Sequence, residues 1–341
     1  MKPDWIKGLS VVLAACLLAG CQSQYAEKLV KPDAGYGKFV LSVTAGSDKL
    51  IEQHRIDLHQ QITMADKTPI DVWVIKARCA AKPANGAVAS ASRGTVVVLH
   101  GMGDSKASYL GAGEKIANLG FDAVLVDLRA HGASGGKYTT YGAVEKTDVK
   151  AVMDELLKQN AVHAPIYAFG VQLGGATAIQ YAAIDPRVKG VAAVDSFRDA
   201  PSQMKHDLVL ATLPVVMSEK DINENIAKAG EIAHFKPESA SPLEAVKTIH
   251  APILLVHGAS ALRPLDLISS QEASNTIYDA ANDPRKLLTV TPGPEQAALA
   301  VIWDAWIADR MDEIASGKIA TGKVRVGSST GPTASPATGL K

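Results

Sequence analysis

The chain has 341 residues, of which 47% are hydrophobic and 21% are charged. Lys and Arg total 35, and Asp and Glu also total 35, so no net field favours nucleic acid or another polyanion as a partner. Aromatic residues make up only 5% of the chain, which leaves few surfaces on which bases or sugars would stack. The length and the apolar content indicate a globular protein with an ample core, within reach of one large α/β domain.

Residues 1–20 have the pattern of a cleaved secretory signal. Lys2 and Lys7 precede an apolar run from Gly8 to Gly20, which suits a signal-peptide core and is short for a membrane-spanning helix. The run ends L-A-G-C at Cys21, and this stretch resembles the bacterial lipoprotein processing box, whose cysteine becomes the lipid-bearing first residue. The resemblance implies a lipid anchor on Cys21 in the cell envelope, and Gln22 after it implies the outer membrane, facing the periplasm. The alternative is an ordinary secretory signal with an incidental cysteine.

Cysteine usage fits this interpretation. Cys16 would leave with the signal and Cys21 would be acylated, so Cys79 is the one thiol that the mature chain would keep. An internal disulfide is then excluded. No Cys/His cluster in the sequence has the spacing of metal ligands, and we expect neither a metal nor another cofactor.

The predicted elements follow in chain order. Residues 21–38 are predicted to be an exposed tether. Alternating or β-branched segments predict opening strands, antiparallel to one another, at Phe39–Thr44, Ile56–Thr63 and Ile70–Ile75. From residue 95 on, short buried strands alternate with helices, which is typical of a parallel sheet covered on both faces. Strands are predicted at 95–99, 121–127, 165–170, 188–194, 253–256 and 286–290, and helices at 105–119, 143–157, 173–184, 265–281 and 295–314.

The folded domain is predicted to span residues 39–315. Within it, residues 197–250 break the alternation of strands and helices with four prolines among short helical stretches. This interval is predicted to be a lid over the C-terminal ends of the strands, where open α/β sheets bind ligands; irregular packing against the sheet edge is the alternative. Residues 316–341 are small, polar and glycine-rich, which predicts a disordered tail.

Four stretches resemble motifs of the α/β-hydrolase superfamily. They are L-H-G-M-G-D-S from Leu99, D-L-R-A-H-G-A-S-G-G from Asp127, G-V-Q-L-G-G from Gly170 and A-P-I-L-L-V-H-G from Ala251. In the order given, they resemble the histidine–glycine turn after the third strand, the loop after the fourth, the nucleophile elbow and the strand before the catalytic acid. The resemblance covers roughly residues 95–315 and implies the α/β-hydrolase fold, although a fold alone does not establish an activity.

The catalytic positions that the resemblance implies are all replaced. Gln172 stands at the elbow, and its carboxamide is a poor nucleophile with no proton on its oxygen for a base to remove. Ala261 stands where the acid belongs, and Gln296 stands where the histidine belongs. No histidine follows Gly258, so a shift of register restores no base in the expected loop. Because nucleophile, acid and histidine are lost together, we expect no covalent hydrolysis.

Backbone groups can still bind a ligand at this place. The family's oxyanion donors map to the amides of Met102 and Leu173, and with Gln172 they predict a pocket for a neutral or weakly anionic small molecule, unless the side chain of Gln172 fills it. Ser196 with His206 is the relocated pair that would support an active, esterase-like hydrolase. The sequence therefore predicts a lipid-anchored envelope protein that binds a small ligand or a protein partner. An active hydrolase and a structural envelope component are the alternatives.

Other polar residues in the motifs have structural interpretations. His100 and His131 are expected to fix loops through hydrogen bonds, as in the family that they resemble. Ser105 follows a turn and is expected to cap the next helix.

Overall fold

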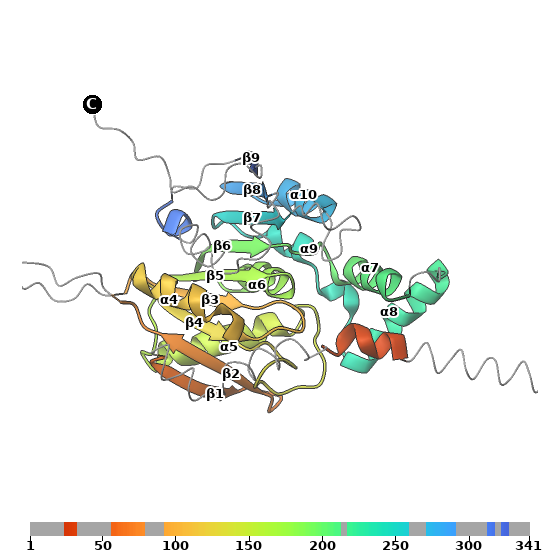
Figure 1. Cartoon of the computed structure of the whole chain (residues 1–341), viewed down its shortest axis with the longest axis horizontal. Helices are drawn as coiled ribbons and strands as arrows, with labels where there is room; N and C mark the ends of the chain where they lie inside the picture. The colour runs from red at the N-terminus through yellow and green to blue at the C-terminus, as the bar shows by residue number, and fades with distance from the viewer. Residues whose placement is uncertain are drawn as a thin grey trace, which may run out of the picture.

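The computed structural model describes residues 24–32, 56–78, 92–212, 217–258, 271–290, 312–317 and 322–326. Helices cover both faces of a central sheet (Figure 1). The strands are β1 Leu58–Thr63, β2 Pro69–Ile75, β3 Thr95–Leu99, β4 Asp122–Val126, β5 Ile166–Val171, β6 Val188–Val194, β7 Ile253–Gly258, β8 Arg285–Val290 and β9 Gly322–Val326. The helices are η1 Lys106–Tyr109, α4 Leu110–Asn118, α5 Glu145–Lys158, α6 Leu173–Ile184, α7 Ala200–Thr212, α8 Glu219–Ala233, η2 Pro237–Ser239, α9 Pro242–Val246 and α10 Gln271–Ala280.

The strands form a single sheet in the order β1-β2-β4-β3-β5-β6-β7-β8-β9. β1 and β2 pair antiparallel, β2 runs antiparallel to β4, and every other neighbouring pair is parallel. β3 and β4 are buried along their whole lengths, as expected of strands that are covered on both faces. The predicted mostly parallel sheet is confirmed.

Two hydrophobic cores lie on the two faces of the sheet. One core joins the sheet to α5, α6 and α10, with Val149, Ile179 and Ile277 fully buried. The other joins it to α4 and the helical residues 312–315, with Ile116 and Ile314 buried. Because β3 to β9 run parallel to one another, their carboxyl ends lie along one edge of the sheet.

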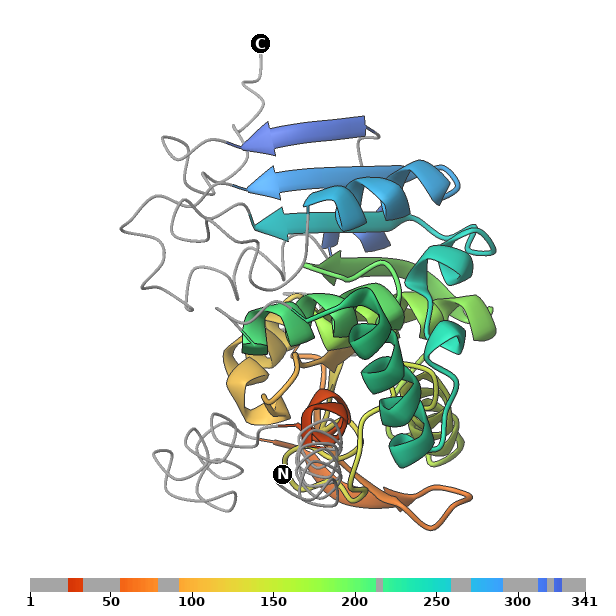
Figure 2. The ribbon, with the colours of Figure 1, turned by 90° about the vertical axis from the view of Figure 1, so that its right-hand side faces the viewer.

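The interval 197–250 is a helical insertion made of α7, α8, η2 and α9. Met204, Ile226 and Val246 bury their side chains in the same core as α5 and α6. Figure 2 shows α7 and α8 in front of the sheet. The predicted insertion is present, and its role as a lid over the strand ends stays a prediction.

The predicted exposed tether is wrong for residues 24–32. Residues 24–30 form a helix, here called the N-terminal helix, which lies beside α8 in Figures 1 and 2. Ala26, Leu29 and Val30 are buried in the core that also holds the insertion, and the hydroxyl of Tyr141 donates to the carbonyl of Leu29 at 2.7 Å. The three apolar residues recur at helical spacing and therefore form a stripe that docks the helix.

The predicted disordered tail is also wrong in part, because β9 pairs in parallel with β8. The K-V-R-V stretch at 323–326 alternates charged and β-branched residues, a pattern that favours a strand at a sheet edge. The predicted strand 39–44 and most of the predicted helix 295–314 lie outside the described residues. In the part of the chain that the structure describes, no helix is both long and apolar enough to cross a bilayer.

Candidate functional site

The turn between β5 and α6 holds Gln172 in a strained backbone conformation. Its φ is 52° and its ψ is −112°, a combination that L side chains rarely adopt and that the surrounding structure must stabilise. Its amide donates to the carbonyl of Val194 at 2.8 Å, and its carbonyl accepts from the amide of Ala176 at 2.9 Å. The sharp strand-to-helix turn is therefore present, with a carboxamide at its centre.

Three glycines make this turn possible because backbone passes close to each of them. A Cβ on Gly170 would lie 2.2 Å from the carbonyl carbon of Gly174, and one on Gly174 would lie 2.1 Å from the carbonyl oxygen of Leu99. A Cβ on Gly175 would lie 2.7 Å from the hydroxyl of Ser196. The glycines thus let α6 approach β3, β5 and β6, a demand that is independent of catalysis.

The side chain of Gln172 lies over the loop that follows β3. A Cβ on Gly101 would lie only 2.7 Å from Gln172 Oε1, so the carboxamide is in close contact with the backbone next to Met102. The amides of Met102 and Leu173 are the predicted oxyanion donors, and neither donates a hydrogen bond to an acceptor within the described ranges. The structure brings these three residues together, with the carboxamide against the loop that carries one donor.

His100 and His131 fix loops, as predicted. His100 Nε2 accepts from the amide of Leu128 at 2.9 Å, so its Nδ1 donates to the carbonyl of Gly101 at 2.8 Å. His131 Nδ1 lies 2.8 Å from the carbonyl of Arg129 and donates to it. Burial lowers the pKa of His100, and burial together with neighbouring His100 lowers the pKa of His131 to about 4. Both imidazoles are therefore neutral near pH 7.

Ser105 occupies the N-cap position of η1, but its side chain makes no capping bond. Asp104 Oδ1 accepts from the amide of Ser105 at 2.7 Å and from the hydroxyl of Ser108 at 2.5 Å. The predicted cap is wrong, because the preceding carboxylate reaches these donors instead. Burial raises the pKa of Asp104.

A buried cation holds the loops around this turn. Lys106 is 4% exposed, and its Nζ lies 2.6 Å from Asp71 Oδ1 and 2.5 Å from Asp127 Oδ2. The ammonium also lies 4.5 Å from the ring centroid of Trp73. Burial acts to raise the pKa of Asp71, and Lys106 with His59 outweighs it, so this pKa lies below its usual range. Sequence reasoning missed this cluster, which ties the segment after the β3 loop to β2 and to the end of β4.

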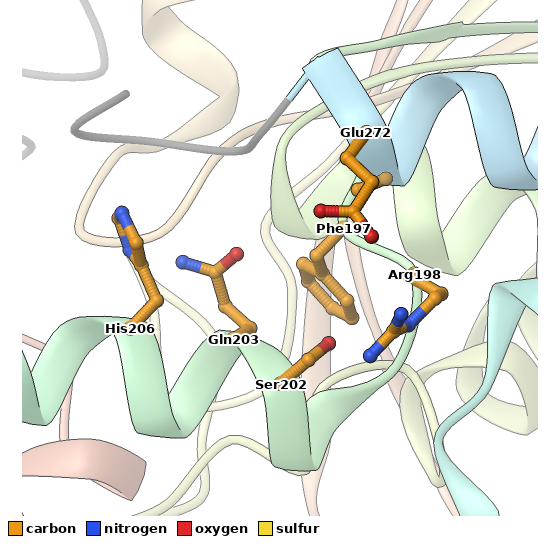
Figure 3. A pocket seen from close by; sticks show the side chains of 7 residues that line it. Phe197, Arg198, Ser202, Gln203, His206 and Glu272 are labelled. Carbon is orange, nitrogen blue, oxygen red and sulfur yellow. The ribbon is translucent and has the colours of Figure 1, made fainter. Parts of the chain in front are cut away.

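The relocated candidates Ser196 and His206 do not share a cavity. Ser196 is 3% exposed, its hydroxyl lies against Gly175, and it has no hydrogen-bond partner within the described residues. His206 lies on α7, where its Nδ1 is 3.5 Å from Asp207 Oδ1, and it lines a cavity to which Ser196 does not contribute (Figure 3). A direct Ser196–His206 pair is therefore not formed.

The structure instead places an imidazole beside a carboxylate at the carboxyl ends of β6 and β7. His257 Nδ1 lies 3.3 Å from Asp195 Oδ1, and His257 is 2% exposed. The amide of Asp195 donates to the carbonyl of Val256, and Gln172 bonds to the neighbouring end of β6. Sequence reasoning looked for the family's histidine beyond Gly258 and named His206 as a relocated base, but it did not consider His257. The V-H-G ending of a parallel strand was the available signal, since carboxyl ends of parallel strands line up at one edge.

Ala261, Gln296 and Cys21 lie outside the described residues. Their assignment to the acid, histidine and lipidation positions therefore stays a prediction from the sequence.

Comparisons with known proteins match this chain to a hydrolase family model and to solved structures of the same fold. The family model described as "Serine aminopeptidase, S33" matches residues 90–228. Esterase Pf2001 from Pyrococcus furiosus superposes with a TM-score of 0.56 at 22% identity, over 78% of this chain and 93% of that one. Est1E from Butyrivibrio proteoclasticus, solved with ferulic acid bound, gives a TM-score of 0.54 at 16% identity, over 76% and 99%.

A curated relative covers only a short part of the chain. YqkD, an uncharacterized protein of Bacillus subtilis, is 35% identical over 89 residues, which are 26% of this chain and 29% of that protein. The chain thus spans less than a third of this relative's length. The family model matches residues 90–228, and the sheet with its sharp β5–α6 turn has the α/β-hydrolase fold. The likeness of this chain to the solved esterases shows the fold alone.

Proposed function

We propose that this chain is a lipid-anchored protein of the bacterial envelope that uses an α/β-hydrolase scaffold for binding and not for covalent hydrolysis. The scaffold would bind either a small neutral or weakly anionic molecule at the elbow or a protein partner. The observation that supports this most directly is Gln172, which takes the strained place of a nucleophile and lies against Gly101. A carboxamide there offers one acceptor and two donors but no attacking oxygen.

The elbow still provides what a carbonyl ligand needs. The amides of Met102 and Leu173 have no acceptor within the described residues, and Leu173 begins a helix whose N-terminus favours partial negative charge. A ligand carbonyl would accept from these amides once the carboxamide of Gln172 turns away from the loop. Because that carboxamide is the far end of a flexible side chain, its displacement requires no backbone movement.

The test uses the full-length chain in mild detergent with a fluorophosphonate probe and p-nitrophenyl butyrate. We expect no covalent labelling and no ester hydrolysis above the buffer rate. The variant with Gln172→Ser, Ala261→Asp and Gln296→His asks whether the scaffold accepts a rebuilt triad. Labelling of the unmodified chain that disappears in Ser196→Ala would show a working nucleophile and overturn the proposal.

Ligand binding at the elbow is tested by thermal unfolding in the presence of short-chain amides and carboxylates. We expect butyramide to raise the melting temperature, and to raise it more in Gln172→Gly, which lacks the carboxamide that occupies the loop. If butyramide and butyrate leave both melting temperatures unchanged, the small-ligand form of the proposal fails and the protein-partner form is left.

A second candidate function is hydrolysis without a covalent intermediate. The proximity of His257 to Asp195 favours it. Nδ1 and Oδ1 lie 3.3 Å apart without a hydrogen bond, and a small rotation that closes this bond would orient the imidazole so that its Nε2 takes a proton from water. The water would add to an ester carbonyl held by the amides of Met102 and Leu173. The tetrahedral adduct would then break its bond to the alcohol, which takes the proton from His257 and leaves with the free acid as the other product; Gln172 would take no part. Such an enzyme would hydrolyse p-nitrophenyl butyrate, resist the fluorophosphonate and lose its activity in His257→Asn.

The lipid anchor has its own test. Cells expressing the chain are fed an alkyne-labelled fatty acid, and the protein is captured and probed for the label. We expect labelling of the chain and its loss in Cys21→Ser. An unlabelled chain would favour the ordinary secretory signal.

A further inference from the structure

A cavity of about 160 Å³ lies between α7 and the start of α10, apart from the elbow. Its lining is Phe197, Arg198, Ser202, Gln203, His206, Glu272 and Ala273 (Figure 3). The volume is several times the ~30 Å³ of a water molecule in the liquid and lies below the ~300 Å³ at which drug-sized pockets begin. It therefore suits an occupant of a few heavy atoms. None of the elbow residues lines it.

Two opposite charges face this cavity without pairing to each other. Figure 3 shows Arg198 and Glu272 extending towards the space beside Phe197 from two different elements. The Nε of Arg198 donates to Asp199 Oδ2 at 2.8 Å, which leaves its two terminal nitrogens as donors. The carboxylate of Glu272 forms no ion pair within the described ranges. A cation and an anion that share a cavity but stay apart leave room for a ligand that contacts both.

The uncharged polar groups of the cavity are left mainly as acceptors. The hydroxyl of Ser202 donates to the carbonyl of Asp199 at 3.0 Å, so its lone pairs remain. The Nε2 of Gln203 donates to Asp207 Oδ1 at 2.8 Å, and Figure 3 shows its oxygen on the side of Phe197. With Glu272 these groups provide three acceptor side chains, which matches the three N–H donors of an ammonium group.

We propose that this cavity binds a small zwitterion of the free α-amino acid class. Its carboxylate would accept from the terminal nitrogens of Arg198, a planar donor pair suited to carboxylates. Its ammonium would donate to Glu272 and the oxygens of Ser202 and Gln203. The ring of Phe197, 4% exposed, would contact the carbon skeleton. This site goes beyond the proposed elbow site, and either can fail without the other.

The experiment is calorimetric titration of the full-length chain in detergent with three matched probes. L-alanine carries both charges, propionate keeps only the carboxylate, and ethylamine keeps only the ammonium. We expect saturable binding of L-alanine with a Kd of roughly 1 mM or tighter, and at least about fivefold weaker binding of either single-charge probe, since each lacks one charge-assisted contact. Arg198→Gln and Glu272→Gln should each weaken L-alanine binding by roughly fivefold.

Controls separate the site from general charge effects and from unfolding. Lys220→Gln and Glu224→Gln remove one charge each from an exposed pair on α8 and should leave the affinity for L-alanine unchanged. The exchange Arg198→Glu with Glu272→Arg should restore binding, because a zwitterion can enter in the reversed orientation. Melting temperatures of all variants should match that of the parent chain.

Three results would overturn the proposal. The first is an absence of saturation by L-alanine up to about 10 mM, tenfold above the expected Kd. The second is equal affinity for propionate and L-alanine, which would indicate an anion site at Arg198 alone. The third is unchanged L-alanine binding in both Arg198→Gln and Glu272→Gln, which would mean that the ligand binds elsewhere.

Discussion

Replacing Lys106 by methionine is expected to lower the free energy of unfolding by about 3–5 kcal/mol. The side chain of Lys106 is 4% exposed, and its loss leaves the carboxylates of Asp71 and Asp127, 2% and 1% exposed, without a cation that lies 2.6 Å and 2.5 Å from them. His59 Nε2, at 3.0 Å from Asp71 Oδ2, still contacts that carboxylate, and the amide of Ala133 still donates to Asp127. We therefore expect a value near the lower end, about 3 kcal/mol.

Urea unfolding at pH 7, followed by far-ultraviolet circular dichroism, measures this change directly. At an unfolding entropy of about 2.1 cal/mol/K per residue, a chain of 341 residues loses roughly 1.4 °C of melting temperature for each kcal/mol, so the variant should melt roughly 4 °C lower. Lys150→Met is the matched control, because Lys150 pairs with Asp154 on the surface of α5 at 38% and 45% exposure. It should cost less than about 1 kcal/mol. If Lys106→Met also costs less than about 1 kcal/mol, the reasoning from buried charge is refuted.

Three further substitutions test other parts of the scaffold. Gly174→Ala should cost about 3 kcal/mol in urea unfolding, because its Cβ would lie 2.1 Å from the backbone oxygen of Leu99; a parent-like midpoint would contradict the close approach of α6 and β3. His131 has a pKa of about 4 in the fold against 6.5 in the unfolded chain, so it stays neutral while the unfolded form binds a proton. The free energy of unfolding should therefore fall by up to about 3 kcal/mol as the pH falls from 6.5 to 4. His131→Gln should remove this part of the pH dependence. If the free energy of unfolding falls equally with pH in the parent and the variant, the assigned role of His131 is wrong. Leu29→Ala should cost about 2 kcal/mol and expose the N-terminal helix to proteolysis, whereas an unchanged digestion pattern would mean that the helix is not held by its buried stripe.

The alternation of strands and helices from residue 95 on was predictable because each element carries its own periodic signal. The predicted bounds of Leu173–Ile184 and Val188–Val194 agree with α6 and β6. The N-terminal helix and β9 were missed for one physical reason. Each is too short to be stable alone and is ordered by a partner distant in sequence: Tyr141 bonds to Leu29 across 112 positions, and β8 pairs with β9.

In the candidate site, too, residues with a local sequence signal were predicted, and contacts between distant segments were missed. Gln172 was found because the glycines around it form a local signature of the turn. The buried ion pair of Lys106 was not found, because a lysine in the sequence gives no sign of the two carboxylates that enclose it until β2 and β4 lie together. The contact of His257 with Asp195 depends likewise on two strand ends meeting at one edge.

If Cys21 carries the proposed lipid anchor, the docked N-terminal helix would set how far the protein can reach from a membrane. Only two residues separate Cys21 from the first helical position at residue 24, and three residue steps extend to about 10 Å at most. An acyl chain on Cys21 would therefore leave the globular body almost no slack. The molecule could turn about this attachment point, but the N-terminal helix, which begins three residues after Cys21, would stay close to the lipid headgroups.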